Sequence, residues 1–239
     1  MDRSDWLEWQ KAIDDELELM TKYQVWDVVK QPPDKNMVGC RRVCGTKHNT
    51  EGKILKYKPR LVAQGFTQIY GVDFLDSFTP VARRSAICTV IALAVSKGRE
   101  LHQIDVKSAY LNSPINAEIY ICLLPGYGQK GVATKLNQGL YGLPQSGNLW
   151  HKTLSTTFNN LHLTRSTVNH GVFYSHDSEG TTILCSLTDN FLITASKTER
   201  MARLKVGRSQ HFKMTDLGEL GWILRICVKP GQIPNPNRS

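Results

Sequence analysis

The spacing of apolar and polar residues along the chain predicts four helices. In the first, apolar residues recur at three- and four-residue steps, and Ser4 can cap the helix. Its apolar face carries Trp6, Trp9, Ile13, Leu17 and Met20. The second pattern, at about 83–97, is closed by Gly98. The third runs from Gly147 to about Leu161, and the fourth covers 198–208.

Strands are predicted where apolar residues alternate or run together. Segments 43–47 and 54–62 flank a polar turn with Asn49 and Gly52, which predicts a β-hairpin. Segment 171–195 predicts three strands joined by reversals at HDSEG and LTDN. Further strands are expected at 101–105, at 132–136, at 222–228, and in a hairpin at 119–124 closed by Pro125 and Gly126. This mixed order of elements predicts the α+β class.

Composition is that of an ordinary globular protein, with 41% hydrophobic and 21% charged residues. These proportions exclude a disordered tail or a collagen-like fibre. The formal charge is +9, and it is unevenly spread: residues 1–40 carry −4, residues 41–100 carry +7 and residues 101–239 carry +6. The basic excess favours a polyanionic partner, nucleic acid first, with a merely solvated basic surface as the alternative.

The cysteines and the N-terminal residues bear on cellular location. Six cysteines are scattered through the 239 residues, which is typical of reduced intracellular thiols. Cys40, Cys44 and His48 lack a fourth zinc ligand at finger spacing. No apolar run is long enough to span about 30 Å of hydrocarbon, and no targeting signal is seen. We therefore expect an intracellular protein, cytoplasmic or nuclear, without a membrane partner.

Two aspartates stand where predicted strands end. Asp105 closes the apolar strand LHQIDV, and Asp189 lies at the reversal between two apolar strands. Carboxylates that converge from two such positions repel each other unless a divalent cation lies between them. Two-metal phosphoryl transfer requires such a pair, although an aspartate at a strand end is more often a turn or cap residue.

Several long stretches of the chain resemble one known family. They are KYKPRLVAQGFTQIYGVDFLDSFTPVA (56–82), LHQIDVKSAYLN (101–112), KLNQGLYGLPQSGNLWH (135–151), the hairpin at 183–195 and HFKMTDLGEL (211–220). In this order they are similar to the reverse transcriptase domain of copia-type retrotransposons, a part of the Pol polyproteins of long-terminal-repeat elements. The resemblance runs from about Trp6 to Val228. It implies the fingers and palm of a right-hand polymerase, with an antiparallel palm sheet packed on helices and a basic fingers hairpin.

The resemblance also implies a reaction and its catalytic positions. The reaction is RNA-directed DNA polymerisation, in which a deoxynucleoside triphosphate delivers its nucleotidyl group to a primer 3′-hydroxyl paired to an RNA or DNA template. The catalytic positions are Asp105, Asp189 and Asn190, and the two aspartates would bind two Mg²⁺ ions. Association with RNase H or integrase parts of Pol, which this sequence lacks, is a further expectation.

Other implied residues would bind the nucleotide and the primer. Three cations, which share one strand face at period two, would meet triphosphate or template phosphates. An aromatic ring would close the sugar pocket against a ribose 2′-hydroxyl, and an amide would contact the incoming nucleotide. The cations are Lys56, Lys58 and Arg60, the ring is Tyr110, the amide is Gln145, and the primer-grip residues are Leu217, Gly218 and Trp222.

On this basis we expect five consecutive regions along the chain. They are a lead-in of helix and strand (1–35), a fingers-like region (36–100), a palm-like region with a fingers insertion (101–210), a primer-grip-like hairpin (211–228) and a flexible tail (229–239).

The second palm motif departs from the family pattern of tyrosine, valine and two aspartates. Here it reads Leu187-Thr188-Asp189-Asn190, so a neutral amide replaces the last carboxylate. A carbonyl oxygen competes less well than a carboxylate for Mg²⁺. One unit charge at ~4 Å is worth about 4 kcal/mol at an effective dielectric of 20. We therefore expect impaired or absent catalysis.

Other motifs also differ from the family pattern. Arg42 stands in a strand that usually carries buried aromatics, and Pro59 replaces an alanine in the fingers strand. The pair Gly147-Asn148 replaces proline-arginine, and Arg225 replaces a glycine. Because these changes lie in different motifs, they indicate relaxed constraint on a diverged copy.

Two functions of other classes stay open. A non-catalytic nucleic-acid-binding remnant, or a domesticated transposon-derived protein, would bind primer–template in a salt-dependent way without needing Asp105 or Asp189. A metal-dependent nuclease using the same carboxylates is less favoured, because no further acidic cluster lies near them in the sequence.

Overall fold

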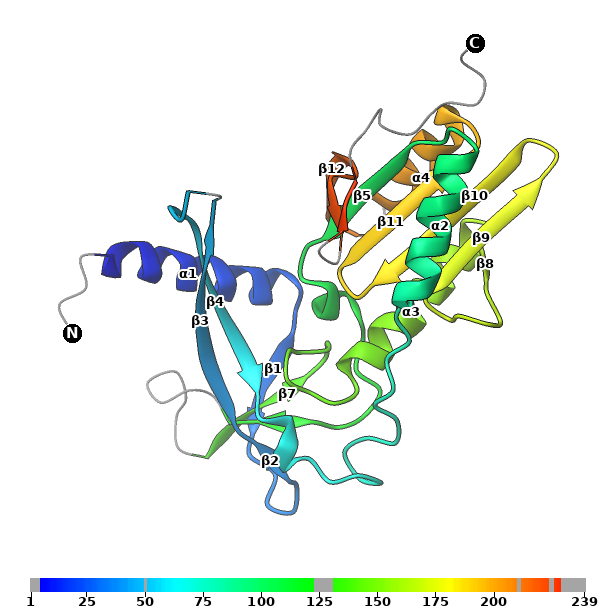
Figure 1. Cartoon of the computed structure of the whole chain (residues 1–239). Helices are drawn as coiled ribbons and strands as arrows, with labels where there is room; N and C mark the ends of the chain where they lie inside the picture. The colour runs from blue at the N-terminus through cyan, green and yellow to red at the C-terminus, as the bar shows by residue number, and fades with distance from the viewer. Residues whose placement is uncertain (1–4, 50, 123–130, 210–211, 224–225, 229–239) are drawn as a thin grey trace, which may run out of the picture. The chain divides into compact units, whose positions relative to one another are not determined.

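A computed structural model describes residues 5–49, 51–122, 131–209, 212–223 and 226–228. The chain forms two compact units that interleave along the sequence. The first comprises Met1–Phe78 and Tyr110–Trp150, and the second Thr79–Ala109 and His151–Ser239. Helices and largely antiparallel sheets occur together, so the predicted α+β class is confirmed (Figure 1).

The first unit combines a helix, a long hairpin and a small sheet. Its elements are α1 (Trp6–Lys22), β1 (Trp26–Lys30), β2 (Met37–Val38), β3 (Cys40–His48), β4 (Ile54–Ala63), a 3₁₀ turn at Gly65–Thr67, β6 (Tyr120–Ile121) and β7 (Val132–Leu136). The small sheet has the order β1-β7-β6-β2, and its β2–β6 pair is parallel. Strands β3 and β4 form a separate antiparallel hairpin, as predicted.

Helix α1 packs on the β3–β4 hairpin (Figure 1). The ring of Trp9 meets that of Tyr57 edge to face at 4.8 Å, and the Trp9 indole N–H donates to Asp5 at 3.1 Å. Trp6 was expected on the buried face but is 58% exposed, so that face begins only at Trp9. Ser4, the predicted cap, lies outside the described residues.

The main core of the first unit gathers apolar residues from distant segments. Its buried members are Met20, Val25, Val38, Leu61, Ala63, Leu111, Ile119, Ile121, Leu136, Leu140 and Leu143. Burying one such aliphatic side chain stabilises the fold by about 1.5–3 kcal/mol. This core therefore fixes the base of the β3–β4 hairpin against the small sheet.

The second unit is built on one large antiparallel sheet. Its elements are α2 (Arg84–Ser96), β5 (Leu101–Val106), β8 (Thr164–Arg165), β9 (Val172–Asp177), β10 (Gly180–Leu187), β11 (Asn190–Ala195), α4 (Thr198–Ser209), β12 (Met214–Glu219), β13 (Trp222–Ile223), β14 (Ile226–Cys227) and the greater part of α3 (Ser146–Asn160). The strand order is β12-β5-β11-β10-β9-β8.

Helices cover both faces of this sheet. Figure 1 shows α2 lying across one face, where Ile87 and Val90 join a core with Leu192. On the other face, Phe158 of α3 meets Phe173 and Phe191 edge to face, at 4.8 and 5.7 Å. The strands that carry the predicted aspartates are therefore held from both sides.

Two strand predictions need correction. Segment 222–228 is not one strand but two short ones, β13 and β14, which pair with each other. Segment HFKMTDLGEL does not join this hairpin, because β12 pairs with β5 at the edge of the six-stranded sheet. In the expected hairpin at 119–124, β6 pairs with β7, and its closing residues Pro125 and Gly126 lie outside the described residues.

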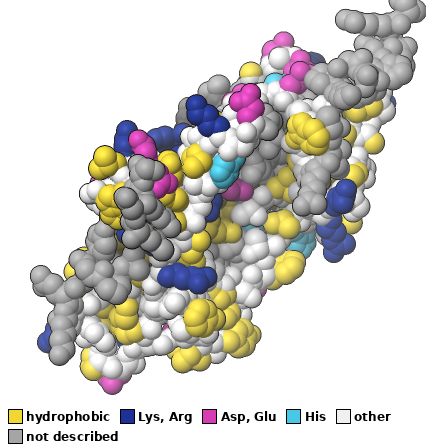
Figure 2. Space-filling model, turned by 60° about the vertical axis from the view of Figure 1, so that its left-hand side comes forward, with side chains coloured by type: hydrophobic (Ala, Val, Ile, Leu, Met, Phe, Trp, Pro, Cys, Tyr) yellow, Lys and Arg dark blue, Asp and Glu magenta, His cyan; other side chains and the backbone are white. Residues whose placement is uncertain are grey.

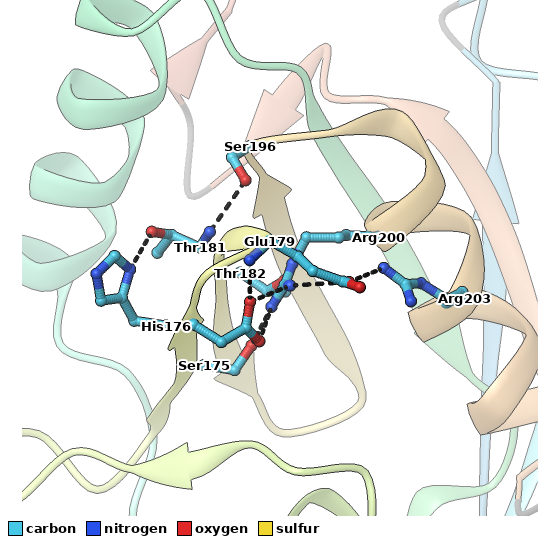
Figure 3. A network of polar contacts seen from close by, with 9 residues as sticks. Ser175, His176, Glu179, Thr181, Thr182, Ser196, Arg200 and Arg203 are labelled. Atoms are coloured by element: carbon cyan, nitrogen blue, oxygen red, sulfur yellow. Dashed lines mark hydrogen bonds and ion pairs between the residues drawn. The ribbon is translucent and has the colours of Figure 1, made fainter.

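A buried arginine ties α4 to the β9–β10 hairpin (Figure 3). Arg200 is only 8% exposed, and its guanidinium donates to three side chains. These are Asp177 at 2.7 and 3.0 Å, Ser175 at 3.0 Å and Thr182 at 3.1 Å. The exposed Arg203 pairs with Glu179 beside it, at 2.6 Å. The hydrogen bond from Arg200 holds the pKa of Asp177 below its usual value.

The other departures from the family pattern are accommodated. Arg42 is half-buried opposite Leu61, and the β3–β4 register is unbroken at Pro59. Asn148 is buried, and its amide donates to Asp76 and to the carbonyl of Phe78, at 2.9 and 2.8 Å. Arg225 lies outside the described residues. Among the described helices, none has the length and apolar character needed to cross a membrane.

Candidate functional site

The pairing of β5 with β11 brings the predicted catalytic positions together. Asp105 and Asn190 are direct partners in this antiparallel pair, and Val106 N–H donates to the carbonyl of Asp189 at 2.7 Å. Opposite residues in such a pair have Cβ atoms about 4.5–5.5 Å apart and side chains on the same face. None of the three side chains is buried. They therefore form a cluster at the solvent-accessible end of two adjacent strands.

A tight turn presents Asp189. Leu187 pairs with Asn190, so Thr188 and Asp189 form a two-residue loop between β10 and β11. Thr188 has a φ of 73°, a left-handed conformation that a β-branched residue adopts only under strain. In two-residue hairpins a positive φ at the first loop position normally calls for glycine. The turn is thus constrained at the residue directly before the aspartate.

The Asn190 side chain is engaged by its neighbours within the sheet. Gln103 Nε2 donates to Asn190 Oδ1 at 3.2 Å, and Asn190 Nδ2 donates to Asp189 Oδ1 at 3.1 Å. The amide oxygen therefore already accepts a hydrogen bond, and the amide nitrogen faces the carboxylate. In this geometry the amide nitrogen of Asn190, and not its oxygen, faces the Asp189 carboxylate.

The donor set decides whether Mg²⁺ fits. Within the described parts of the chain, no three His, Cys, Asp or Glu side chains are grouped to hold a metal ion. Asp105 and Asp189 alone supply two carboxylates, and Mg²⁺ in phosphoryl-transfer sites is commonly held by one or two carboxylates with substrate phosphates and water. The residues present fit Mg²⁺, with one anionic ligand fewer than the family pattern provides.

In the first unit, Arg60 and Tyr110, two of the predicted nucleotide-binding residues, both contact the ring of Tyr141. The guanidinium carbon of Arg60 lies 5.5 Å from the ring centre of Tyr141, within cation–π range. The rings of Tyr141 and Tyr110 meet edge to face at 4.9 Å. Tyr141 was not predicted from the sequence, because a tyrosine in a loop carries no signal of its own.

Lys56 and Lys58, which share the strand face with Arg60, differ in how far they are exposed to solvent. Lys56 is exposed and Lys58 is half-buried on β4. Glu16 of α1 lies close enough to interact electrostatically with Arg60 and Lys56. Burial raises the pKa of Glu16 above its usual value, and the two cations partly offset this shift.

Gln145 is buried, and the residue that fixes it was not predicted from the sequence. Gln145 Nε2 donates to the Asp73 carbonyl at 3.4 Å, and its Oε1 has no hydrogen-bond partner among the described residues. The Asp73 carboxylate, 6% exposed, accepts bonds from Asn36 Nδ2 at 2.8 Å and Ile69 N–H at 2.7 Å. Asp73 therefore organises the loop 69–73, a role for which no separate signal is present in the sequence.

The residues expected in the primer grip lie at the edge of the second unit. The β12–β5 register shifts between Asp216 and Gly218, so Leu217 is a bulged residue and is 50% exposed. Gly218 has a φ of 74°, which suits the bulge. Trp222 on β13 is 66% exposed. The exposed side chains of Leu217 and Trp222 can therefore be reached by a ligand.

Figure 2 shows how basic side chains are distributed on one face of the molecule. On the face shown in Figure 2, Lys and Arg side chains lie in small separate groups among hydrophobic ones, outside the area that grey atoms cover. On this face the net charge of +9 is therefore not gathered into one continuous basic patch.

An antiparallel sheet covered by helices, with Asp105 near the end of one strand and Asp189 in the turn that leads into its neighbour, agrees with the nucleic-acid polymerase class. The family model for "Reverse transcriptase (RNA-dependent DNA polymerase)" matches residues 23–233, so the chain belongs to this family. Its relatives are of the copia type, which confirms the resemblance.

Two curated relatives show how the chain compares with whole polyproteins. It is 33% identical over 91% of its length to the "Retrovirus-related Pol polyprotein from transposon TNT 1-94" of Nicotiana tabacum. It is 29% identical over 92% of its length to the "Retrovirus-related Pol polyprotein from transposon RE1" of Arabidopsis thaliana. The aligned part covers 17% and 15% of these relatives, so the chain corresponds to about a sixth of their length.

Proposed function

We propose that this chain is the fingers and palm of an RNA-directed DNA polymerase, with the β3–β4 hairpin as fingers and the six-stranded sheet as palm. The observation that carries the proposal is the direct pairing of Asp105 with Asn190, with Asp189 in the adjoining turn. Membership of the reverse transcriptase family supports the nucleotidyl-transfer chemistry.

The roles follow from the chemistry of each side chain. Asp105 and Asp189 supply carboxylates on a rigid sheet, where Mg²⁺ would activate the primer 3′-hydroxyl and neutralise the triphosphate. Arg60 offers a forked donor to phosphate oxygens, and Tyr110 limits the space beside the sugar. Leu217 and Trp222 contribute exposed apolar surface for the primer end.

The proposal includes weak catalysis by this chain. Asn190 leaves two carboxylates where the family pattern has three, and its amide nitrogen donates to the Asp189 oxygen. The site therefore reaches a hydrogen-bonded state without a cation, which reduces the drive to bind one.

Primer extension on an RNA template tests this proposal. The chain is compared with Asn190→Asp and with Asn190→Asp combined with Asp105→Asn. We expect extension to rise at least tenfold in Asn190→Asp, equivalent to about 1.4 kcal/mol of barrier, and to vanish in the double variant. Strong extension by the unmodified chain that Asn190→Asp leaves unchanged would contradict the charge reasoning.

A second candidate is a nucleic-acid-binding protein without catalysis. The hydrogen-bonded state of Asp189 and Asn190 favours it, because the sheet needs no cation to be stable. It predicts primer–template binding that survives Asp105→Ala but weakens when Lys56 and Lys58 are replaced by alanine. The slope of log affinity against log salt would become shallower by about 0.9 for each phosphate that the variant no longer neutralises.

A further inference from the structure

We propose that Tyr141 is a positioning residue of the nucleotide site, whose ring sets both Arg60 and Tyr110. The inference rests on the proposed function and adds to it a residue whose ring couples phosphate binding to sugar selection. All three residues belong to the first unit, so their mutual geometry is defined within one compact body.

The Tyr141 ring has a cation over its face and a second aromatic ring beside it. The Arg60 guanidinium lies over the ring, 5.5 Å from its centre. The Tyr110 ring lies at 4.9 Å with an interplanar angle of 64°, an edge-to-face contact. Because a guanidinium is planar, contact with a ring face restricts the direction of its donors as well as its position.

The backbone of Tyr141 is fixed to the strand that carries Arg60. Ala63 N–H, at the end of β4, donates to the Tyr141 carbonyl at 2.7 Å. The next residue, Gly142, has a φ of +90°, and a Cβ there would lie 2.1 Å from the Ala63 carbonyl oxygen. Only glycine permits this approach, so the Tyr-Gly pair holds the ring at a set distance from β4.

These contacts distinguish Arg60 from the other cations on its strand face. Among the described residues, Lys56 and Lys58 make no aromatic contact of this kind, and they lie nearer the hairpin tip. Removal of the Tyr141 ring is therefore expected to release Arg60 and to leave Tyr110 without its edge contact. The first change weakens nucleotide binding, and the second relaxes discrimination between deoxyribose and ribose.

The test measures nucleotide binding without turnover. The full chain is bound to an RNA template carrying a dideoxy-terminated DNA primer, and retention of the complex against heparin is measured as the next complementary nucleotide is added. Tyr141→Leu is compared with Tyr141→Phe, which keeps the ring. Tyr23→Leu is the matched control, because Tyr23 is a half-buried tyrosine packed on the core of the same unit.

We expect Tyr141→Leu to raise the half-saturating deoxynucleotide concentration about tenfold, equivalent to the removal of roughly one good cation–π interaction. It should also narrow the preference for deoxynucleotide over ribonucleotide, while primer–template affinity without nucleotide stays unchanged. Tyr141→Phe should restore both properties, and Tyr23→Leu should alter neither.

Two results would overturn the inference in different ways. Unchanged nucleotide affinity and sugar preference in Tyr141→Leu would refute the role of Tyr141 alone. If added nucleotide failed to stabilise any complex, in the unmodified chain and in Asn190→Asp alike, the proposed polymerase function would fall and this inference with it.

Discussion

Replacing Asn190 by aspartate is expected to make the second unit less stable without a divalent cation and more responsive to one. The Asn190 nitrogen is 3.1 Å from Asp189 Oδ1. A carboxylate oxygen at that separation repels its neighbour by about 5 kcal/mol at an effective dielectric of 20. This is an upper bound, because the side chains are half-exposed and can turn toward water. We expect a net loss of about 1–2 kcal/mol, or roughly 3–6 °C in melting temperature.

The assay is a melting curve at neutral pH, recorded with chelator and then with increasing Mg²⁺. The variant should begin below the unmodified chain and regain stability as Mg²⁺ is added, since a ligand that binds only the folded state stabilises it. Tenfold tighter binding corresponds to about 1.4 kcal/mol at saturating Mg²⁺. The initial deficit should disappear at low pH, because protonation of the new carboxyl removes the repulsion.

Asn159→Asp is the charge-matched control. It adds the same negative charge at an exposed position of α3 and should show no gain in Mg²⁺ response. If Asn190→Asp responds to Mg²⁺ no more than Asn159→Asp does, the electrostatic explanation of the second palm motif is refuted.

Three further tests, each with its own substitution, examine the framework of the two units. Arg200→Met should lower the stability of the second unit by about 2 kcal/mol, because the hydrogen bonds of a buried guanidinium to Asp177, Ser175 and Thr182 are lost. Arg203→Met removes only an exposed pair and should matter far less; urea unfolding compares the two variants. Glu16→Gln should raise the melting temperature at pH 7. The pKa of Glu16 is raised in the folded protein, so the fold becomes less stable as the pH rises and this carboxyl ionises. The gain should vanish as the pH falls below 4.5, the usual pKa of a glutamate. Gly142→Ala, where a Cβ would meet the Ala63 oxygen, should cost more than Gly52→Ala, which has a similar φ of +82° but open space, and circular dichroism melts would rank the two.

Elements with strong local signals were predictable from the sequence. The β3–β4 hairpin is set by alternating residues and by a turn in which the Asn49 side chain accepts bonds from the N–H groups of Glu51 and Lys53. Helix α2 follows from a continuous apolar pattern before Gly98. The place of Asp105 near a strand end and of Asp189 in a reversal was predictable from the apolar runs beside them, whereas their convergence was expected only from the resemblance to a known family.

Long-range pairings were not predictable, because nothing in a strand's own residues names its partner. The pairing of β12 with β5 depends on the register of the whole sheet, and two short strands replaced the expected segment 222–228. The hydrogen bonds of Asn190 and the role of Tyr141 depend on side-chain geometry across strands and loops. The exposure of Trp6 was not predictable for a similar reason: helical periodicity shows which face of a helix is apolar but not how far along the helix its packing partner extends.

Metal-directed cleavage of the backbone would test the proposed cation site most directly, because it maps where a divalent cation binds. Fe²⁺ is added to Asn190→Asp in place of Mg²⁺, with ascorbate and peroxide, so that radicals formed at the bound metal cut the nearest backbone. We predict cuts in β5 near Asp105 and in the turn at Thr188 and Asp189, both abolished when either aspartate becomes asparagine. Cuts confined to other segments, or cuts at these positions that persist without Asp105 and Asp189, would contradict the proposed site.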